Sequence, residues 1–248
     1  MLSIRRYLKL AIVHIPKSVT QLRRLDREAL AAHYLRGHGI EIGALHNPLK
    51  VSRRAHVRYV DRMTIADLRT HYPELARERL VPVDIIDDGE TLSNIQAASQ
   101  DFVIANHFLE HCENPLGALE NMARVLKPDG VLFMCIPDKR RTFDHNRPVT
   151  PFEHVERDYR EDPVWSRRSH YEEWVRLFER VTGDDAVAKR ANELMQQQYS
   201  IHYHIWTSKE MVELFHRGSR VARVPAEIEC FLKYNEEVIL IVRKSPVD

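Results

Sequence analysis

The segment 101–137 constrains the fold more than any other part of the chain. Its pattern predicts a buried strand over residues 102–105, a helix over about 116–126, a Pro-Asp-Gly turn and a second buried strand over 131–136. Continuous apolar strands joined through a helix are typical of a parallel sheet that is covered on both faces. The sequence therefore predicts an α/β protein with a doubly wound, mostly parallel sheet.

The composition is that of a globular protein. Of its 248 residues, 44% are hydrophobic and 29% are charged, and the formal net charge of +1 gives no reason to expect nucleic acid as a partner. Three widely spaced cysteines, Cys112, Cys135 and Cys230, suit a reducing compartment. The sequence has no apolar run long enough to span a membrane and no signal-peptide pattern. We therefore expect a cytoplasmic protein.

The first 36 residues are predicted to form a helical region that precedes the main domain. Residues 2–13 interleave basic and apolar side chains, which suits a helix packed on its own domain and also a peripheral contact with a membrane or a partner protein. A second helix is predicted over residues 20–35, ending before Gly37 and Gly39. The main domain is then expected to span residues 37–248.

Two stretches of the central segment resemble a known family. DFVIANHFLEH and LKPDGVLF are similar to a segment of class I S-adenosylmethionine-dependent methyltransferases of the type 11-like group, which share an LEH turn and an LKPGG turn. The resemblance implies a Rossmann-like methyltransferase fold with a seven-stranded sheet that ends in an antiparallel hairpin. It also implies S-adenosylmethionine as the cofactor. Strands expected over residues 229–234 and 238–242 fit that hairpin.

The residues expected to bind the cofactor begin at the first strand. In the resembled family the motif acid-x-Gly-x-Gly-x-Gly binds the methionine part of the cofactor. Glu41 and Gly43 match its start and Ala44 follows, whereas the later glycines of the motif are absent from this chain. Asp61 ends the next predicted strand about 20 residues beyond Glu41, which is the spacing at which a carboxylate binds a ribose diol. Asp61, with Arg62 after it, is therefore the main cofactor candidate. The alternative is an acid at the start of a helix over residues 63–71.

The third strand and its exit are expected within residues 80–89. The resemblance implies that an acid at its end binds the adenine amine, with Asp84 as first choice and Asp87 as second, and that the backbone of Ile85 approaches the adenine ring. Asn106 and His107, after the fourth strand, complete the cofactor set. A nicotinamide-dependent enzyme would use the same half of the sheet, and it stays open as an alternative.

The loop after the fourth strand holds the candidates for chemistry, and three interpretations stay open. His107 or His111 can act as a general base. Alternatively, His107, Glu110 and His111 bind a metal, because His-x-x-Glu-His resembles the Glu-x-x-Glu-His site of small-RNA 2′-O-methyltransferases and ubiquinone O-methyltransferases, with His202 or His204 as the later ligand. In the third interpretation Glu110 and His111 only cap the next helix.

Residues 138–205 are too long for a simple crossover and are predicted to form a helical cap. The cap mixes basic side chains with aromatic ones, which suits a polar acceptor and equally a solvated lid. PDKRRTFDHNRPVTPFEH resembles methyltransferases of polysaccharide and O-antigen biosynthesis. The sequence therefore predicts an enzyme that methylates an oxygen of a small-molecule or glycan acceptor. The alternative is an inactive protein of the same fold that acts as a binding partner in a glycan-assembly complex.

Overall fold

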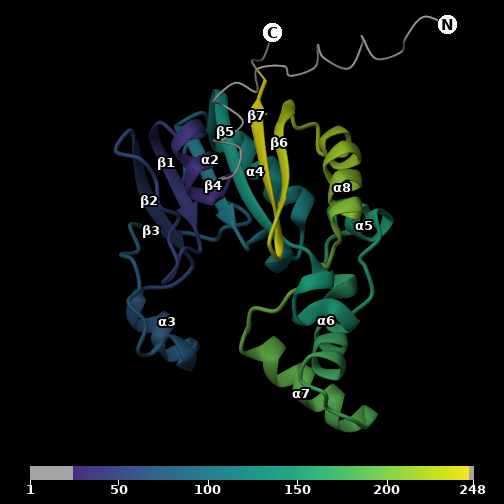
Figure 1. The fold of residues 1–248 in the computed structure, drawn as a ribbon. Helices are drawn as coiled ribbons and strands as arrows, with labels where there is room; N and C mark the ends of the chain where they lie inside the picture. The colour runs from purple at the N-terminus through teal and green to yellow at the C-terminus, as the bar shows by residue number, and fades with distance from the viewer. Residues whose placement is uncertain (1–24, 246–248) are drawn as a thin grey trace, which may run out of the picture.

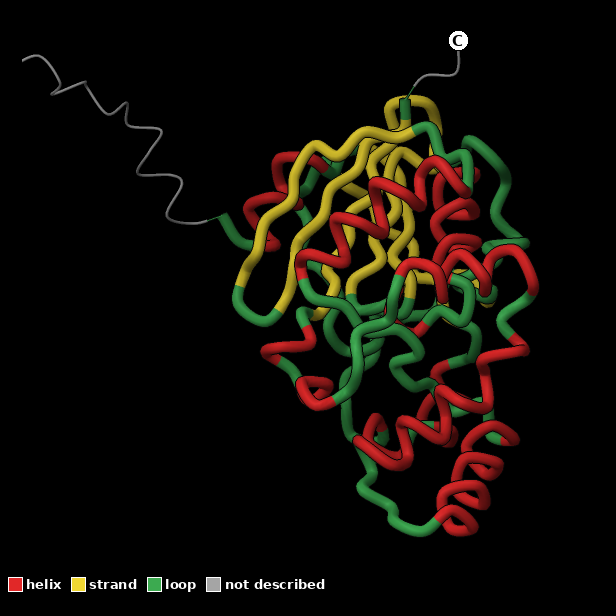
Figure 2. The backbone as a smooth tube through the Cα atoms, turned by 90° about the vertical axis from the view of Figure 1, so that its right-hand side faces the viewer, coloured by secondary structure: helices red, strands yellow, loops and turns green. Residues whose placement is uncertain are grey.

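The computed structural model describes residues 25–245, and its centre is one sheet in the order β3-β2-β1-β4-β5-β7-β6. All neighbouring strands pair in parallel except β7, which is antiparallel to β5 and β6. Figure 2 shows the strands in the upper half of the molecule. The strands are β1 (Gly37–Ile42), β2 (Ala55–Asp61), β3 (Ile85–Ile86), β4 (Gln100–Asn106), β5 (Leu126–Pro137), β6 (Ala226–Tyr234) and β7 (Glu237–Lys244).

Side chains of the central strands point alternately to two separate cores, one on each face of the sheet. Along β4, Phe102 and Ile104 pack on the face covered by α2, whereas Val103 and Ala105 pack on the face covered by α4 and α8. All four side chains are fully buried, which explains the uninterrupted apolar run in the sequence. The helices are α2 (Arg27–Tyr34), α3 (Ile65–His71), α4 (Pro115–Val125), α5 (Phe152–Glu161), α6 (Val164–Leu177), α7 (Asp184–Gln196) and α8 (Ser208–Val221).

This architecture confirms the predicted fold class, including the antiparallel hairpin of β6 and β7. The predicted turn at Pro-Asp-Gly lies inside β5, where the pairing moves from Gln100–Leu126 to Phe102–Val131. Residues 127–130 therefore bulge out of the ladder, and Asp129 adopts a left-handed conformation with φ of 62°.

The third strand lies within the predicted stretch 80–89 but is short. Residues 80–84 are irregular, and β3 consists of Ile85 and Ile86 alone. Pro82 has no N–H for a ladder hydrogen bond, which disfavours regular pairing before Ile85. Asp84 consequently lies before the strand and not at its carboxyl end, so this part of the prediction is wrong.

The chain between β5 and α8, residues 138–207, forms the cap. Its short helical turns η5 (Lys139–Arg141) and η6 (Phe143–Asn146) are followed by α5, α6 and α7. Helices α6 and α7 share a small core of their own, which includes Tyr171, Trp174 and Leu194. Figure 1 shows α3, α6 and α7 beyond the same end of the sheet, where the loops after β2 and β5 emerge. The cap and α3 thus lie next to the carboxyl ends of the parallel strands.

Two predictions concern the start of the chain and membranes. The basic and apolar residues 2–13, and residues 20–24 of the second predicted helix, lie outside the described residues. The described part of that helix is α2. Within residues 25–245, no helix combines the length and apolar character needed to cross a bilayer.

Candidate active site

A cavity of about 350 Å³, here named the inner cavity, lies at the carboxyl ends of the parallel strands. Its walls come from the ends of β1 and β2, the loops that follow β3 and β4, the α3 region, and Tyr199 and Ser200 of the cap. Strands β1 and β4 are neighbours in the sheet, so the strand order reverses between them. Ligands of open α/β sheets bind at such a reversal.

The loop after β1 presents backbone, and not its acid, to the inner cavity. Gly43 has a φ of 63°, and no atom lies within 4 Å of the position that a Cβ would occupy, so its backbone faces open space. The buried carboxylate of Glu41 accepts hydrogen bonds from the backbone N–H of Leu49, at 2.9 and 3.2 Å. Glu41 and Ala44 do not line the cavity. Glu41 therefore stabilises the conformation of this loop and does not face the cavity.

Asp61 lies where the sequence predicts it, as the last residue of β2, and it lines the inner cavity. The side-chain cap of α3 is Thr64, which accepts a hydrogen bond from Asp67 N–H, so Asp61 does not start that helix. Burial raises the pKa of Asp61 despite hydrogen bonds from the backbone of Met63 and Arg62. A half-buried carboxylate with free acceptor capacity is suited to a ligand with hydroxyl groups.

The loop after β3 presents different acids from those predicted. Asp84 accepts a hydrogen bond from Tyr59 N–H at 2.8 Å and does not line the inner cavity, and neither does Ile85. Asp87 binds within its own loop, to Asn94 N–H at 2.8 Å. Asp88, Gly89 and Glu90 line the cavity instead, and the Glu90 carboxylate is occupied by the backbone N–H groups of Glu113 and Asn114. The two-residue strand β3 shifts the cavity-facing position toward Asp88.

His107 is held at the edge of the inner cavity by a buried carboxylate from the last hairpin. Its Nε2 lies 2.8 Å from Glu237 Oε2, and Arg27 of α2 forms an ion pair with the same carboxylate. The same Nε2 also lies 2.8 Å from Arg27 Nη2. We assign the proton to Nε2, because the carboxylate can only accept, and the neutral ring then has its lone pair on Nδ1. Nδ1 lies 3.6 Å from Glu110 Oε1. Glu237 and Arg27 lie far from His107 in sequence, and no motif in the chain identifies them.

The carboxylates around His107 set its charge. Burial lowers the pKa of His107, but the hydrogen bond with Glu237 and the negative charges of Glu110 and Glu237 outweigh burial, so the pKa is raised overall. The backbone of His107 is in the left-handed region, with a φ of 48°, which is uncommon for a residue other than glycine. Asn106, just before it, has a buried side-chain oxygen without a hydrogen-bond partner among residues 25–245.

Glu110 and His111 form a short turn, η4 (Leu109–His111), and do not cap α4, whose cap is Asn114. His111 Nδ1 lies 2.9 Å from the carbonyl oxygen of Ile201, so Nε2 has the lone pair. Burial and the neighbouring His202 lower the pKa of His111 to about 3. His111 is therefore neutral, whereas His107 is the better proton acceptor.

The predicted metal ligands are divided between two places. Glu110, His111 and His202 each offer one ligand atom, and these atoms lie within 4.8 Å of one another. Both carboxylate oxygens of Glu110 are buried without a hydrogen-bond partner in the described residues. This set can bind a cation. His204 lies instead with three side chains of the cap, at a second place.

A second cavity, here named the outer cavity, has a volume of about 920 Å³ and lies between α3 and the cap. It shares Arg62, Glu74 and Tyr199 with the inner cavity, so the two adjoin. Trp174 and Phe178 also line it, together with charged residues of α3, of α7 and of the loop after α6. The arrangement offers a cavity for one ligand at the sheet and a larger one for a second ligand under the cap.

The sheet is Rossmann-like, and the inner cavity lies at the reversal of its strand order. Residues 42–134 match a family whose description is "Methyltransferase domain", and this match includes Gly43, Asp61 and the loop from Asn106 to His111. For this part of the chain the match confirms the predicted enzyme class, a methyltransferase, and the predicted cofactor, S-adenosylmethionine.

Three solved structures are similar to this chain over most of its length. A SAM-dependent methyltransferase from Methanosarcina mazei is 16% identical, with 89% of this chain and 99% of that chain covered and a TM-score of 0.47. A protein from Pyrococcus horikoshii OT3 is 17% identical, with 94% and 93% covered and a TM-score of 0.47. A SAM-dependent methyltransferase from Aquifex aeolicus is 10% identical, with 91% and 87% covered and a TM-score of 0.43. No curated protein matches the sequence.

The contact between His107 and Glu237 predicts the titration of this histidine. We expect a pKa above the ordinary 6.5 for His107, and a lower pKa in Glu237→Gln, because the substitution removes the charge that stabilises the imidazolium. NMR of the ring nitrogens across a pH series measures the pKa of His107. The His107 signal is identified by its absence from the spectrum of His107→Asn. The exposed neighbour provides a control, since Glu236→Gln leaves the pKa unchanged. A His107 pKa below 6.5 in the parent protein would contradict this assignment.

Proposed function

We propose that this enzyme methylates a hydroxyl group of a saccharide-like acceptor. The observation that carries the proposal is the contact between the two cavities at Arg62, Glu74 and Tyr199. The inner cavity, at the reversal of the strand order, is the place for the cofactor. The acceptor then occupies the outer cavity, from which a hydroxyl group can approach His107.

Gly43, Asp61 and Asp88 are the cofactor-binding residues in this proposal. The open backbone at Gly43 suits the methionine part, and Asp61 accepts hydrogen bonds from both ribose hydroxyls. Asp88 replaces Asp84 as the acid next to the adenine, because it lines the cavity and Asp84 does not. Arg62 lines both cavities and donates to Tyr72 Oη at 2.6 Å, so it positions the wall between the ligands.

His107 acts as the general base. S-adenosylmethionine supplies a methyl group on a positively charged sulfur. With the methyl donor bound, His107 Nδ1 would accept the proton of the acceptor hydroxyl as its oxygen takes the methyl group, and S-adenosylhomocysteine would be the leaving product. Glu237 fixes the ring through Nε2, and the charges of Glu110 and Glu237 stabilise the imidazolium that forms. His111, neutral and half-buried, contributes a hydrogen-bond acceptor beside it.

The lining of the outer cavity supports a saccharide as the acceptor class. The rings of Trp174 and Phe178 lie 4.1 Å apart between centroids and offer apolar faces for the C–H face of a sugar. Arg62, Glu74 and Glu179 on the same lining offer hydrogen-bond groups for its hydroxyls. The three cysteines are free thiols, which suits a cytoplasmic enzyme acting in polysaccharide biosynthesis.

Substitution of Asp61 tests the cofactor position. Asp61→Asn should weaken binding of S-adenosylmethionine about 10- to 100-fold, because it replaces charge-assisted hydrogen bonds to the ribose by weaker ones. Titration calorimetry measures the dissociation constant. Asp67→Asn is the matched control, because Asp67 lines only the outer cavity and should leave cofactor binding unchanged. Equal losses in the two variants, or none in Asp61→Asn, would place the cofactor elsewhere.

Substitution of His107 tests the chemistry. Asn adopts the left-handed backbone of this position more readily than most residues, so His107→Asn preserves the loop. We expect turnover to fall about 10²- to 10⁴-fold while the dissociation constant for S-adenosylmethionine changes little. Formation of S-adenosylhomocysteine and of methylated product is measured by mass spectrometry with a panel of free and nucleotide-linked monosaccharides. His38→Asn, at an exposed position near the start of β1, is the control.

Two outcomes of that experiment count against the proposal. If His107→Asn retains parent turnover, His107 is not the base. If turnover instead depends on His202 and not on His107, the set of Glu110, His111 and His202 supports a metal-assisted transfer in its place. Methylation of amines alone in a wider acceptor panel would overturn the saccharide assignment.

A further inference from the structure

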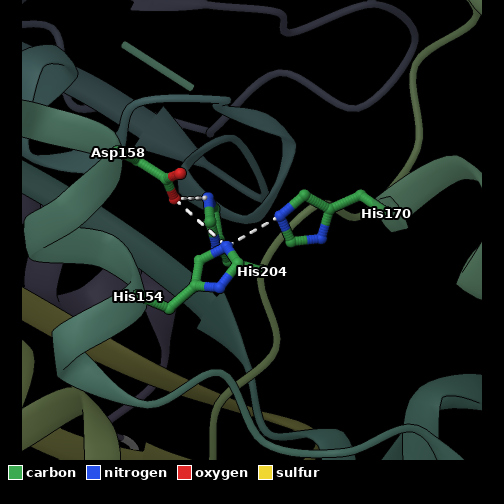
Figure 3. A group of neighbouring side chains, drawn as sticks. All are labelled: His154, Asp158, His170 and His204. Atoms are coloured by element: carbon green, nitrogen blue, oxygen red, sulfur yellow. Dashed lines mark hydrogen bonds and ion pairs between the residues drawn. The ribbon is translucent and has the colours of Figure 1, made fainter. Parts of the chain in front are cut away.

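The cap contains a second group of histidines, here named the cap cluster: His154, Asp158, His170 and His204. His154 and Asp158 lie one turn apart on α5, His170 lies on α6, and His204 lies on the extended segment before α8. Figure 3 shows the four side chains pointing toward one another from these three elements. Each offers one ligand atom, and the four atoms lie within 4.8 Å of one another.

The cap cluster leaves buried polar atoms without partners. Asp158 and His204 are fully buried, and Asp158 Oδ2 and His204 Nδ1 have no hydrogen-bond partner among residues 25–245. Asp158 Oδ2 lies 3.3 Å from His154 Nε2 and 3.6 Å from His204 Nε2, but neither contact has hydrogen-bond geometry. An unsatisfied buried carboxylate oxygen is costly. A cation bound to Asp158 Oδ2 would remove the cost of leaving that carboxylate oxygen without a partner.

The spacing of the ligand atoms fits tetrahedral coordination. Bonds of about 2.0–2.1 Å to a central ion place tetrahedral ligand atoms about 3.3 Å apart. His154 Nε2 lies 2.9 Å from His170 Nε2 and 3.3 Å from Asp158 Oδ2, and the pair of Asp158 and His204 is 3.6 Å apart. These three separations bracket the tetrahedral value. Little movement is needed to admit a metal ion.

We propose that His154, Asp158, His170 and His204 form a structural zinc site in the cap. Three imidazoles and one carboxylate are nitrogen and oxygen donors of the type that zinc binds in four-coordinate sites. Four protein ligands complete the tetrahedron, so the ion has no open position for substrate. The site therefore stabilises the fold and takes no part in methyl transfer.

Neighbouring side chains orient the ligands and shield the site. Ser166 donates a hydrogen bond to Asp158 Oδ1 at 2.9 Å, which leaves Oδ2 for the ion. Such outer contacts are typical of zinc sites. Trp165 packs on the His154 ring, with centroids 4.8 Å apart, and Arg157 lies over Trp165. Since 21% of the His154 side chain is exposed, the ion can enter on that side.

The proposed zinc ion would join the cap to the active-site loop. The backbone N–H groups of Tyr203 and His204 donate to the carbonyl oxygen of Glu110, at 2.8 and 3.2 Å. His204 therefore links the zinc site directly to the turn that holds Glu110 and His111. A metal at this place fixes the segment that also carries Tyr199 and Ser200 to the inner cavity. Loss of zinc should loosen the cap over both cavities.

Zinc content of the full-length protein tests the proposal. Plasma mass spectrometry should find about one zinc per chain in the parent protein and less than about a tenth of that in His170→Gln, because four-coordinate zinc depends on each ligand. His202→Gln, which alters only the set of Glu110, His111 and His202, should retain the ion, and so should the exposed control His216→Gln. Thermal unfolding should shift to lower temperature in the parent after chelation and recover when zinc is added.

Replacement by cobalt keeps the test decisive if His170→Gln does not fold. Cobalt-loaded parent protein and His202→Gln should both give the intense visible absorption of tetrahedral cobalt. The proposal is overturned if the parent protein binds neither zinc nor cobalt on titration. It is also overturned if His202→Gln loses the metal while Asp158→Asn keeps it, since the ion would then belong to the other set.

Discussion

The buried carboxylate of Glu237 holds together three parts of the chain that are far apart in sequence. It binds Arg27 at the start of α2, His107 in the loop after β4, and it begins β7 itself. Burial raises the pKa of Glu237, but the hydrogen bonds and charges of His107 and Arg27 outweigh it and lower the pKa overall. The position and the charge of His107 both depend on this contact. Removal of one partner from this buried group would leave a charge uncompensated. Arg27, His107 and Glu237 therefore act as a unit.

Much of the fold follows from local patterns. Uninterrupted apolar runs predict β4 and β5, because both faces of these strands are covered, and Asp61 ends β2 as its spacing from Glu41 indicates. The family match lies in this same part of the chain. The prediction fails at β3, where Pro82 disfavours pairing and a strand of two residues displaces the cavity-facing acid from Asp84 to Asp88. A short strand has too few residues for its pattern to fix the register.

The sequence predicts only those residues of the candidate site that lie together in one loop. Asn106, His107, Glu110 and His111 are neighbours in sequence, whereas Glu237 and Arg27 reach them through the tertiary fold. His202 and His204 lie two residues apart on an extended segment, so their sequence spacing alone would allow both to bind one ion. In the structure His202 joins Glu110 and His111, whereas His204 joins the cap cluster, because the loop after β4 and the cap helices approach this segment separately. His154 and His170 carry no motif, since their partners come from three separate elements.

The central claim is that the methyl donor occupies the cavity between Gly43, Asp61 and His107, and a crystal structure of the protein with S-adenosylhomocysteine tests it most directly. The account predicts the ribose hydroxyls within hydrogen-bond distance of Asp61, the amino-acid part against the backbone of Gly43 and the sulfur facing His107. The outer cavity would then remain open toward the sulfur. A ligand bound in the outer cavity, or one whose ribose does not contact Asp61, would contradict the account.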